Sequence, residues 1–266
     1  MRIIRFALLA LALVLSLPAA AQDQDDKGFL VSKIQELLSG AGRQVSIDGF
    51  QGALSSAASF DRMTISDSEG IWLTLEDVVL DWNRSALLRG RLEVEELSAG
   101  RIDIPRLPKG EEQVLPDAEA TPFTLPKLPE LPVAININAI NIAQVNLGAP
   151  LAGQAVQLEM NANATLNDDG LDVAFKANRT DDKRGAFGMT AVLARGADTL
   201  DLLLELSEEE GGIVSTLLTI PENPSVDLTV KANGPLDDLT TDIKLDTDGE
   251  ERLAGQVQVI TQGDAS

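Results

Sequence analysis

Residues 158–165 read LEMNANAT and residues 171–178 read LDVAFKAN, and these two stretches decide the fold. In both, apolar side chains alternate with polar ones, with Ala174 as the exception. Strict alternation is the pattern of a β-strand that buries one face, and it is typical of antiparallel sheets. The two stretches therefore predict half-buried antiparallel strands. Their apolar side is formed by Leu158, Met160, Ala162, Ala164, Leu171, Val173, Phe175 and Ala177.

The same alternation recurs, between turn-forming residues, from residue 133 to residue 260. Together with shorter strands expected between residues 43 and 105, the chain has about 15 candidate strands, which would stack to roughly 70 Å at ~4.8 Å per strand. Only 3% of the residues are aromatic, so the apolar side is almost entirely aliphatic. We therefore expect a mainly β fold, an elongated antiparallel sheet with one apolar face that must be covered.

The composition argues against several functional classes. The 266 residues include no His and no Cys, so the usual proton shuttle, the usual thiol nucleophile and the usual ligands of structural zinc are missing. A formal net charge of −21 opposes binding to nucleic acid and to anionic lipid surfaces through general electrostatics. We therefore expect a protein that is not an enzyme, uses no cofactor or metal, and does not bind nucleic acid.

Acidic clusters stand at the ends of several expected strands. A calcium loop would need oxygen ligands over a longer, regular spacing. Asp and Gly tolerate the backbone angles of tight turns, so turn chemistry explains the clusters better than a calcium site or a pair of hydrolytic carboxylates. The clusters are Asp168-Asp169-Gly170, Asp181-Asp182, Asp237-Asp238 and Asp246-Thr247-Asp248-Gly249.

Residues 1–21 have the pattern of an export signal. Arg2 and Arg5 precede an apolar run at residues 6–17, and Ala19-Ala20-Ala21 supplies a cleavage site of the A-x-A type. Twelve apolar residues are short for a bilayer span, which needs roughly 20. Cleavage after Ala21 is the first expectation, and retention as a tilted anchor is the alternative. Both predict an exported chain.

Residues 28–40 are the one clear helix candidate. Their apolar side chains fall on one helical face, while Lys33, Gln35 and Glu36 face away. We expect this helix to close the N-terminal end of the sheet, together with two tryptophans. The predicted structural cap consists of Leu30, Ile34, Leu37, Leu38, Trp72 and Trp82.

Between residues 43 and 105 the pattern indicates short strands and turns. Residues 67–70 (DSEG) predict a hairpin turn. The following strand is expected to be apolar on both faces, with Trp72, Val78, Leu80 and Trp82 on one side and Ile71, Leu73, Leu75 and Val79 on the other. A short helical turn is expected at residues 83–88. Two further strands are expected on either side of Ala99-Gly100.

Seven prolines fall between residues 105 and 132, and each removes a backbone donor. This segment predicts a linker or surface strap, with a Pro-rich ligand as a minor alternative. The sheet resumes at residue 133, and a slip in its alternation indicates a bulge near Asn138. The expected organisation is a signal at 1–21, a helix and sheet cap at 22–105, a linker at 106–132 and a repetitive β segment at 133–266.

Several short motifs resemble the TamB family, the inner-membrane-associated subunits of the translocation and assembly module of Gram-negative bacteria. The stretch from residue 70 to residue 90 is the more specific part of this resemblance. The similar motifs are DGFQG at 48–52, GIWL at 70–73, DWN at 81–83, LLRG at 87–90, GPLDDL at 234–239 and GQV at 255–257.

The resemblance implies an AsmA-like protein whose sheet is curled into an open groove and carries phospholipid tails along an apolar lining. It also implies a periplasmic chain associated with the inner membrane, a TamA-like outer-membrane barrel as partner, and a role in outer-membrane protein assembly. The family's C-terminal module, which meets the barrel, has no counterpart in this sequence, so the chain is expected to be a fragment. The lining expected on this basis is Leu158, Met160, Val173, Phe175, Phe187, Met189, Leu202, Leu204, Leu228 and Val230.

Two other classes of protein fit the residues. The strands could close into a secreted structural or binding β-sandwich or solenoid, with the apolar faces packed on each other and no lipid conduit. On periodicity alone the closed sandwich or solenoid is favoured over an open lipid groove. The resemblance to the TamB family reverses this preference. A secreted hydrolase is the third alternative, weakened further by the absence of His.

Overall fold

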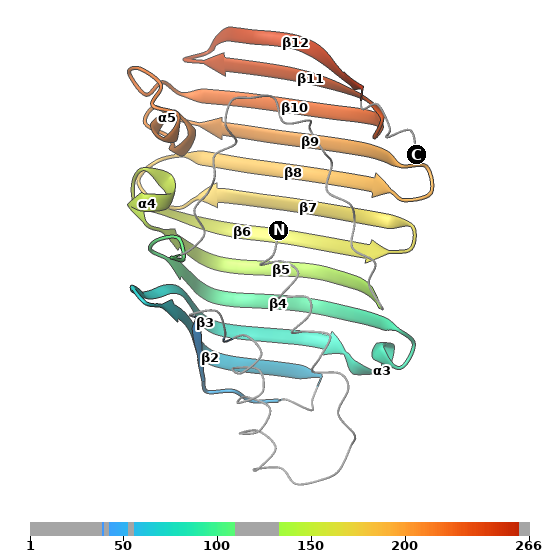
Figure 1. Ribbon diagram of the computed structural model, residues 1–266. Coiled ribbons are helices and arrows are strands. Elements are labelled where there is room, and N and C mark those ends of the chain that lie inside the picture. The colour runs from blue at the N-terminus through green and yellow to red at the C-terminus, as the bar shows by residue number, and fades with distance from the viewer. Residues whose placement is uncertain (1–38, 40–42, 53–55, 110–132, 261–266) are drawn as a thin grey trace.

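The computed structural model describes residues 39, 43–52, 56–109 and 133–260, which form one sheet with three short helices (Figure 1). The expected signal at 1–21, the expected helix at 28–40 apart from residue 39, and residues 110–132 of the linker lie outside the described residues. The strands are β1 (Gln44–Asp48), β2 (Ala57–Asp67), β3 (Gly70–Asn83), β4 (Arg91–Ile104), β5 (Ala134–Leu147), β6 (Val156–Asn167), β7 (Gly170–Arg179), β8 (Gly185–Ala194), β9 (Thr199–Glu208), β10 (Val226–Pro235), β11 (Asp238–Thr247) and β12 (Glu250–Ile260). The helices are α3 (Arg84–Leu87), α4 (Ala149–Ala152) and α5 (Ile213–Leu217).

The strands lie in the sheet in their order along the chain, from β1 to β12. All neighbours are antiparallel except β4 and β5, which pair in parallel from Arg91↔Ala134 to Ile104↔Leu147. The sheet is therefore mainly antiparallel, as expected, and parallel at this one junction. A parallel pair needs a long crossover connection, and residues 105–133 provide it. The described strands number 12, fewer than the count expected from the alternation.

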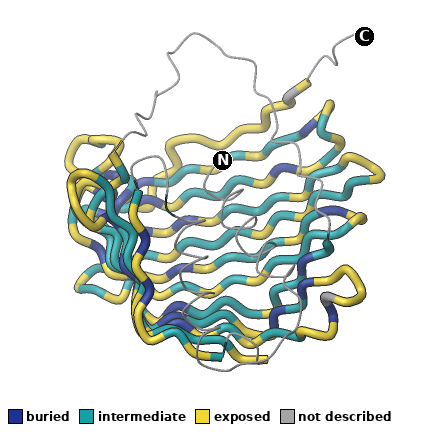
Figure 2. The backbone as a smooth tube through the Cα atoms, turned by 60° about the horizontal axis from the view of Figure 1, so that its bottom comes forward, coloured by how far each residue is buried: buried dark blue, intermediate teal, exposed yellow. Residues whose placement is uncertain are grey.

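The sheet is open and curled, as expected. Its edges are β1 and β12, and these two strands do not pair with each other among the described residues. Figures 1 and 2 show β3, β4 and β5 bent along their length, so the sheet curves instead of lying flat. Bulges supply such bends because an extra residue increases the local twist and kinks the strand.

Two of these irregularities lie in the ladder between β5 and β6. The register shifts between Ile137 and Ile140 and again between Ile142 and Val145. The first shift confirms the bulge predicted near Asn138. On β3, Asp77 has a φ of 52°, in the left-handed region. Opposite it, an added Cβ on Gly100 would lie 3.1 Å from the Asp77 Cβ, a tight contact, so a glycine suits the close approach of the two strands.

The irregularity at Asp77 changes the face assignment expected for β3. Val78 forms a buried cluster with Ala99, Ile142 and Val145, and Leu75 packs against that same cluster. Leu75 therefore lies on the same face as Val78, and its expected place on the opposite face was wrong. The residue at positive φ advances the alternation by one position. Val79 points to the other side and is exposed.

The region around Ala99-Gly100 differs from the expected pair of strands. β4 runs without a break through both residues. Gly100 serves the close contact with Asp77 rather than a turn. The helical turn expected at residues 83–88 is confirmed by α3, and the hairpin turn expected at residues 67–70 is confirmed by the link between β2 and β3.

The acidic clusters lie in turns, as their chemistry predicted. The hairpin between β11 and β12 turns at Asp248 and Gly249, whose φ values of 52° and 73° are both in the left-handed region. Positive φ at both central residues is typical of the tight hairpin turn that suits twisted strands. The hairpin between β6 and β7 turns at Asp168 and Asp169.

Candidate functional site: the apolar face and its helical rim

One face of the sheet, called here the apolar face, carries rows of apolar, mostly aliphatic side chains that run across the strands. Residues paired in a ladder share a face, so the register defines each row. One row crosses five strands through Phe175, Met189, Leu204, Val230 and Ile243. The adjacent row runs through Phe187, Leu206, Leu228, Leu245 and Leu253.

The ten residues expected to line a groove all belong to this face. Leu158 pairs with Val145 on β5, and Met160 pairs with Ala177 on β7, so both residues of β6 lie on the apolar face. Val173 pairs through Ala191 with Leu202. All ten side chains are half-buried, neither enclosed nor fully exposed. A closed core would enclose most of them, so the apolar face from β6 to β10 is a surface that remains partly accessible (Figure 2).

The side chains of the apolar face are more deeply buried on the N-terminal strands β4 and β5 than on β6 to β10. Leu92 and Val94 on β4 pack with Ile135 on β5 into a cluster whose members are almost fully buried. Trp82 lies against this cluster and is half-buried. Trp72 is buried, but it alternates with Leu73 and Leu75 and therefore lies on the opposite face, so its expected place on the same face as Val78 and Trp82 was wrong. Neither indole N–H has a hydrogen-bond partner in the described part of the chain. The other four members of the predicted cap, Leu30, Ile34, Leu37 and Leu38, lie outside the described residues.

Two short helices form a rim along one end of the strands (Figure 1). Ala152 of α4 and Ile213 of α5 form a buried cluster with Val156. Leu158 and Phe187 of the apolar face pack against this cluster. The helices therefore cover the part of the apolar face nearest these strand ends, and the face continues along the strands as half-buried surface.

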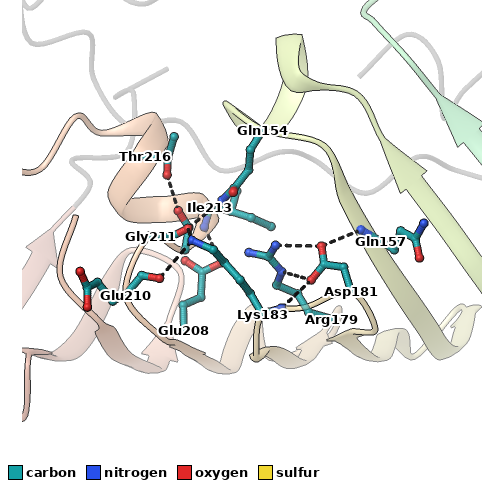
Figure 3. A network of polar contacts seen from close by, with 11 residues as sticks. Gln154, Gln157, Arg179, Asp181, Lys183, Glu208, Glu210, Gly211, Ile213 and Thr216 are labelled. Carbon is teal, nitrogen blue, oxygen red and sulfur yellow. Dashed lines mark hydrogen bonds and ion pairs between the residues drawn. The ribbon is translucent and has the colours of Figure 1, made fainter.

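Glu208 fastens α5 to the sheet (Figure 3). It follows Leu206 in phase on β9 and is therefore on the apolar face, where its side chain is buried. Its carboxylate accepts the backbone N–H groups of Ile213 at 2.9 Å and Val214 at 2.8 Å. These donors belong to the first turn of α5 and have no partner within the helix. A buried charge on an apolar face is thereby satisfied by backbone donors.

A second set of contacts ties three loops at the rim together. Gln154, just after α4, donates to the carbonyl of Gly211 at 2.7 Å. Lys183 donates to the same carbonyl at 2.8 Å and to that of Glu210 at 3.2 Å (Figure 3). One carbonyl therefore joins the β5–β6, β7–β8 and β9–β10 connections.

Arg179 lies beside this network. It is paired with Leu158 in the ladder, so the row containing Val145 and Leu158 ends in a guanidinium. Its side chain is only 2% exposed and forms two hydrogen bonds with Asp181, at 2.9 and 2.8 Å. Burial raises the pKa of Asp181, but hydrogen bonds from Arg179 and from the Gln157 and Lys183 backbone outweigh this, so the pKa lies below its usual value.

The rim residues were not predicted from the sequence, although a signal was present. Leu202, Leu204 and Leu206 alternate toward the apolar face, and the next residue in phase is Glu208. A charged side chain in an apolar phase must find partners or lie at the edge of the buried region. Arg179 departs from the alternation of β7 in the same way.

The opposite face of the sheet is polar and acidic. Amide side chains bridge to carboxylates across the strands, as in Asn178 to Glu159 at 3.2 Å and Gln256 to Asp242 at 2.9 Å. Asn138 donates in the same way to Glu95 at 2.8 Å. These neutral donors satisfy carboxylates without cancelling their charge, whereas other carboxylates of this face are paired with cations, as Glu76 is with Arg62. Among the described residues, no group of three or more acidic side chains is placed to hold a metal ion.

Comparisons of the chain with protein-family models, with curated proteins and with solved structures gave no match. Within the described ranges, no helix is long and apolar enough to cross a membrane. The structure itself shows an open, curled β-sheet with one apolar face and a helical rim.

Proposed function

We propose that the chain is a periplasmic section of a TamB-like bridge that guides phospholipid tails along its apolar face. The observation that carries the proposal is the state of the ten expected lining residues, which are half-buried in continuous rows. Aliphatic rows without large steps suit flexible tails, and the residues of one row are separated only by the strand spacing, ~4.8 Å.

The energetics suit transport along a groove. Removing a tail of ~15 methylenes from water is worth very roughly 12 kcal/mol, at about 0.8 kcal/mol per methylene. Because similar side chains recur in each row, this gain changes little as a tail moves from strand to strand. No nucleophile, metal or cofactor takes part. The polar groups of Glu208 and Arg179 stand at the rim, where a tail would leave the apolar surface.

The cellular setting belongs to the same proposal. The expected export signal supports a periplasmic chain that is associated with the inner membrane through its N-terminal segment. The resemblance to the TamB family supports an outer-membrane barrel as partner and a contribution to outer-membrane protein assembly. The strong negative charge of the chain opposes contact with anionic lipid headgroups. Contact with lipid is therefore expected through the tails, on the apolar face.

Site-specific photo-crosslinking in living cells tests the proposal. A photoreactive amino acid is placed at Phe175 or Leu204 on the apolar face. The matched controls are Lys176 and Glu205, the next residues on the same strands, which are exposed on the polar face. We expect phospholipid adducts at the first two positions and none above background at the controls. Equal adduct levels on both faces, or none on the apolar face, would refute a lipid-carrying groove.

Aspartate variants separate the groove from a closed sandwich. In a sandwich, Phe175→Asp and Leu204→Asp would each bury an unpaired charge and unfold the domain. On an open groove the new carboxylate reaches water, so the sheet should persist while lipid adducts at neighbouring positions disappear. Circular dichroism and thermal melting of the variants give the result. Leu92→Asp, in the buried cluster of β4, is the control that should unfold the protein in either case.

A further inference from the structure

The free edge of β12 is unlike the other edge of the sheet. On β12, Leu253 and Val257 are each 50% exposed and Ile260 is 67% exposed. On β1, the apolar side chains Val45 and Ile47 are both 8% exposed. Within the described residues, nothing pairs with the outer side of β12. A long apolar edge strand is a template for pairing with another strand.

Little in β12 protects this edge. Natural edges are usually guarded by charged residues, proline or a bulge. In β12 the charges Glu250, Glu251 and Arg252 stand at the start of the strand, where the register also shifts opposite Leu245 and Asp246. The rest of the strand, residues 253–260, reads LAGQVQVI and contains no charged residue and no proline. The unprotected part therefore runs from residue 253 to the end of the strand.

We propose that β12 pairs antiparallel with β12 of a second copy of the chain, about a two-fold axis at Gly255. In this register Leu253 lies opposite Val257 of the second copy, and Ala254 lies opposite Gln256. Between residues 253 and 257 the pairs match apolar with apolar or small with small or polar, while further out Arg252 lies opposite Gln258, and Glu251 and Glu250 lie opposite residues 259 and 260 of the second copy. The interface is self-complementary, as a two-fold interface must be.

The charges favour this direction of pairing over the parallel one. In a parallel pair, Glu250 and Glu251 would each face their own copies, and like charges directly opposite each other are destabilising. In the antiparallel register the two acidic ends are separated by about 34 Å, from ten residues at ~3.4 Å each. That is several times the screening length of about 8 Å at physiological salt.

The pairing extends the apolar face instead of covering it. Residues opposite each other in a ladder share a face, so a two-fold axis normal to the sheet keeps both apolar faces on the same side. The row that runs through Leu228, Leu245 and Leu253 then continues into Val257 of the second copy. The pairing follows from the edge itself and does not depend on what the apolar face carries.

Cysteine substitution provides the test, because the chain has no cysteine of its own. An added side chain at Gly255 meets nothing within 4 Å, so Gly255→Cys should fold. Opposed residues have Cβ atoms about 4.5–5.5 Å apart, and a disulfide needs about 3.8 Å, so the on-axis cysteines can join with a small shift. We expect the purified full chain with Gly255→Cys to form a disulfide dimer under mild oxidation. Ser46→Cys, on β1, is the control and should stay monomeric.

A mixture of two variants tests the register. Leu253→Cys and Val257→Cys should form a mixed disulfide when combined, and each should form less dimer with itself. Circular dichroism identical to that of the unsubstituted chain confirms that each variant folds. Cross-linking of Leu253→Cys with Ser46→Cys would show head-to-tail pairing of β12 with β1 and would overturn the proposal.

Light scattering coupled to gel filtration tests the unsubstituted chain. We expect a dimer whose fraction rises with concentration and with added salt, because screening weakens the repulsion between two chains of charge −21. The double variant Leu253→Lys/Val257→Lys should be monomeric. A monomer at all concentrations, with no disulfide at position 255 above the Ser46→Cys control, would overturn the proposal.

Discussion

Arg106 binds Asp67 through two parallel hydrogen bonds, with Nη2 2.6 Å from Oδ1 and Nη1 2.9 Å from Oδ2. Arg106 also donates to the carbonyl of Gly70 at 2.7 Å, and the backbone N–H of Lys109 donates to Asp67 at 2.6 Å. The beginning of the long connection after β4 is thereby fastened to the β2–β3 turn. Bidentate pairs of this kind are among the stronger polar contacts in proteins.

Replacing Arg106 should loosen this fastening. Arg106→Lys keeps the charge but cannot form two parallel hydrogen bonds. We expect a small fall in Tm for Arg106→Lys and a larger one for Asp67→Ala, which removes every acceptor at once. Differential scanning calorimetry measures the effect. Arg62→Lys is the control, since Arg62 forms only a 3.7 Å ion pair with Glu76 and should melt as the unsubstituted chain does.

The same contact predicts a dependence on acidity. The hydrogen bonds from Arg106, followed by those of the Lys109 and Glu69 backbone, hold the pKa of Asp67 well below its ordinary value. A carboxyl with a lowered folded pKa stabilises the protein fully above its unfolded value of about 3.9, and the gain is lost as the pH falls through the folded pKa. We therefore expect the fall in Tm caused by Asp67→Asn to be smaller at pH ~2.5 than at pH 7, because part of the gain is lost between the unfolded pKa and the lower folded pKa. An equal effect at both pH values would show that the charge of Asp67 is not involved.

Truncations should separate the buried clusters from the half-buried face. Leu92 is 3% exposed, so Leu92→Ala should lower the free energy of unfolding by about 2–5 kcal/mol. Leu204 is only half-buried, so Leu204→Ala should cost roughly half as much. Urea denaturation followed by circular dichroism measures both values. Equal losses would mean that Leu204 belongs to a closed core.

Removing the Glu208 carboxylate should release α5 from the sheet. Glu208→Ala leaves the N–H groups of Ile213 and Val214 without acceptors in a buried place, at a cost of about 2–3 kcal/mol. Amide hydrogen exchange should show lost protection in α5 before any other element. Glu209→Gln is the matched control: its partner Arg184 is almost fully exposed, so the change should stay within about 0.5 kcal/mol.

The close approach of Asp77 and Gly100 predicts a compensating pair of variants. Gly100→Ala brings a new Cβ within 3.1 Å of Asp77 and should cost about 1 kcal/mol or more. Asp77→Gly removes that obstacle and also suits the positive φ at this position. We expect the double variant Gly100→Ala/Asp77→Gly to be more stable than Gly100→Ala alone. Additive effects of the two changes would show that the side chains do not meet.

Much of the fold could be predicted because alternation and turn chemistry are local. In strands β6 to β12, the alternation within each strand predicts which of its residues lie on the apolar face. The turn at Asp248 and Gly249 follows from the residues that tolerate a positive φ. Even the bulge near Asn138 is visible as a slip in the alternation. The placement of the ten groove residues on one face follows from the same local pattern.

Other features depend on contacts between distant segments and could not be predicted. Asp77, at a positive φ, marks the shift of phase in β3 where it lies close to Gly100 of β4, a relationship that neither segment reveals alone. Gly100 belongs to a continuous strand, although glycine in isolation indicates a turn. Glu208 finds its partners in a helix of five residues that has no amphipathic pattern of its own.

The parallel junction between β4 and β5 divides the sheet into two parts with different folding requirements. Strands β1 to β4 and strands β5 to β12 each form by successive hairpins, whose contacts are close in the sequence and assemble quickly. The β4–β5 ladder instead requires the connection at residues 105–133 to close, which costs chain entropy before any contact is gained. The two meanders should therefore form first and join last, so that a newly made chain passes through a state with two additional unpaired edges, at β4 and at β5. That interval, rather than the finished sheet, is when the protein is most exposed to aggregation.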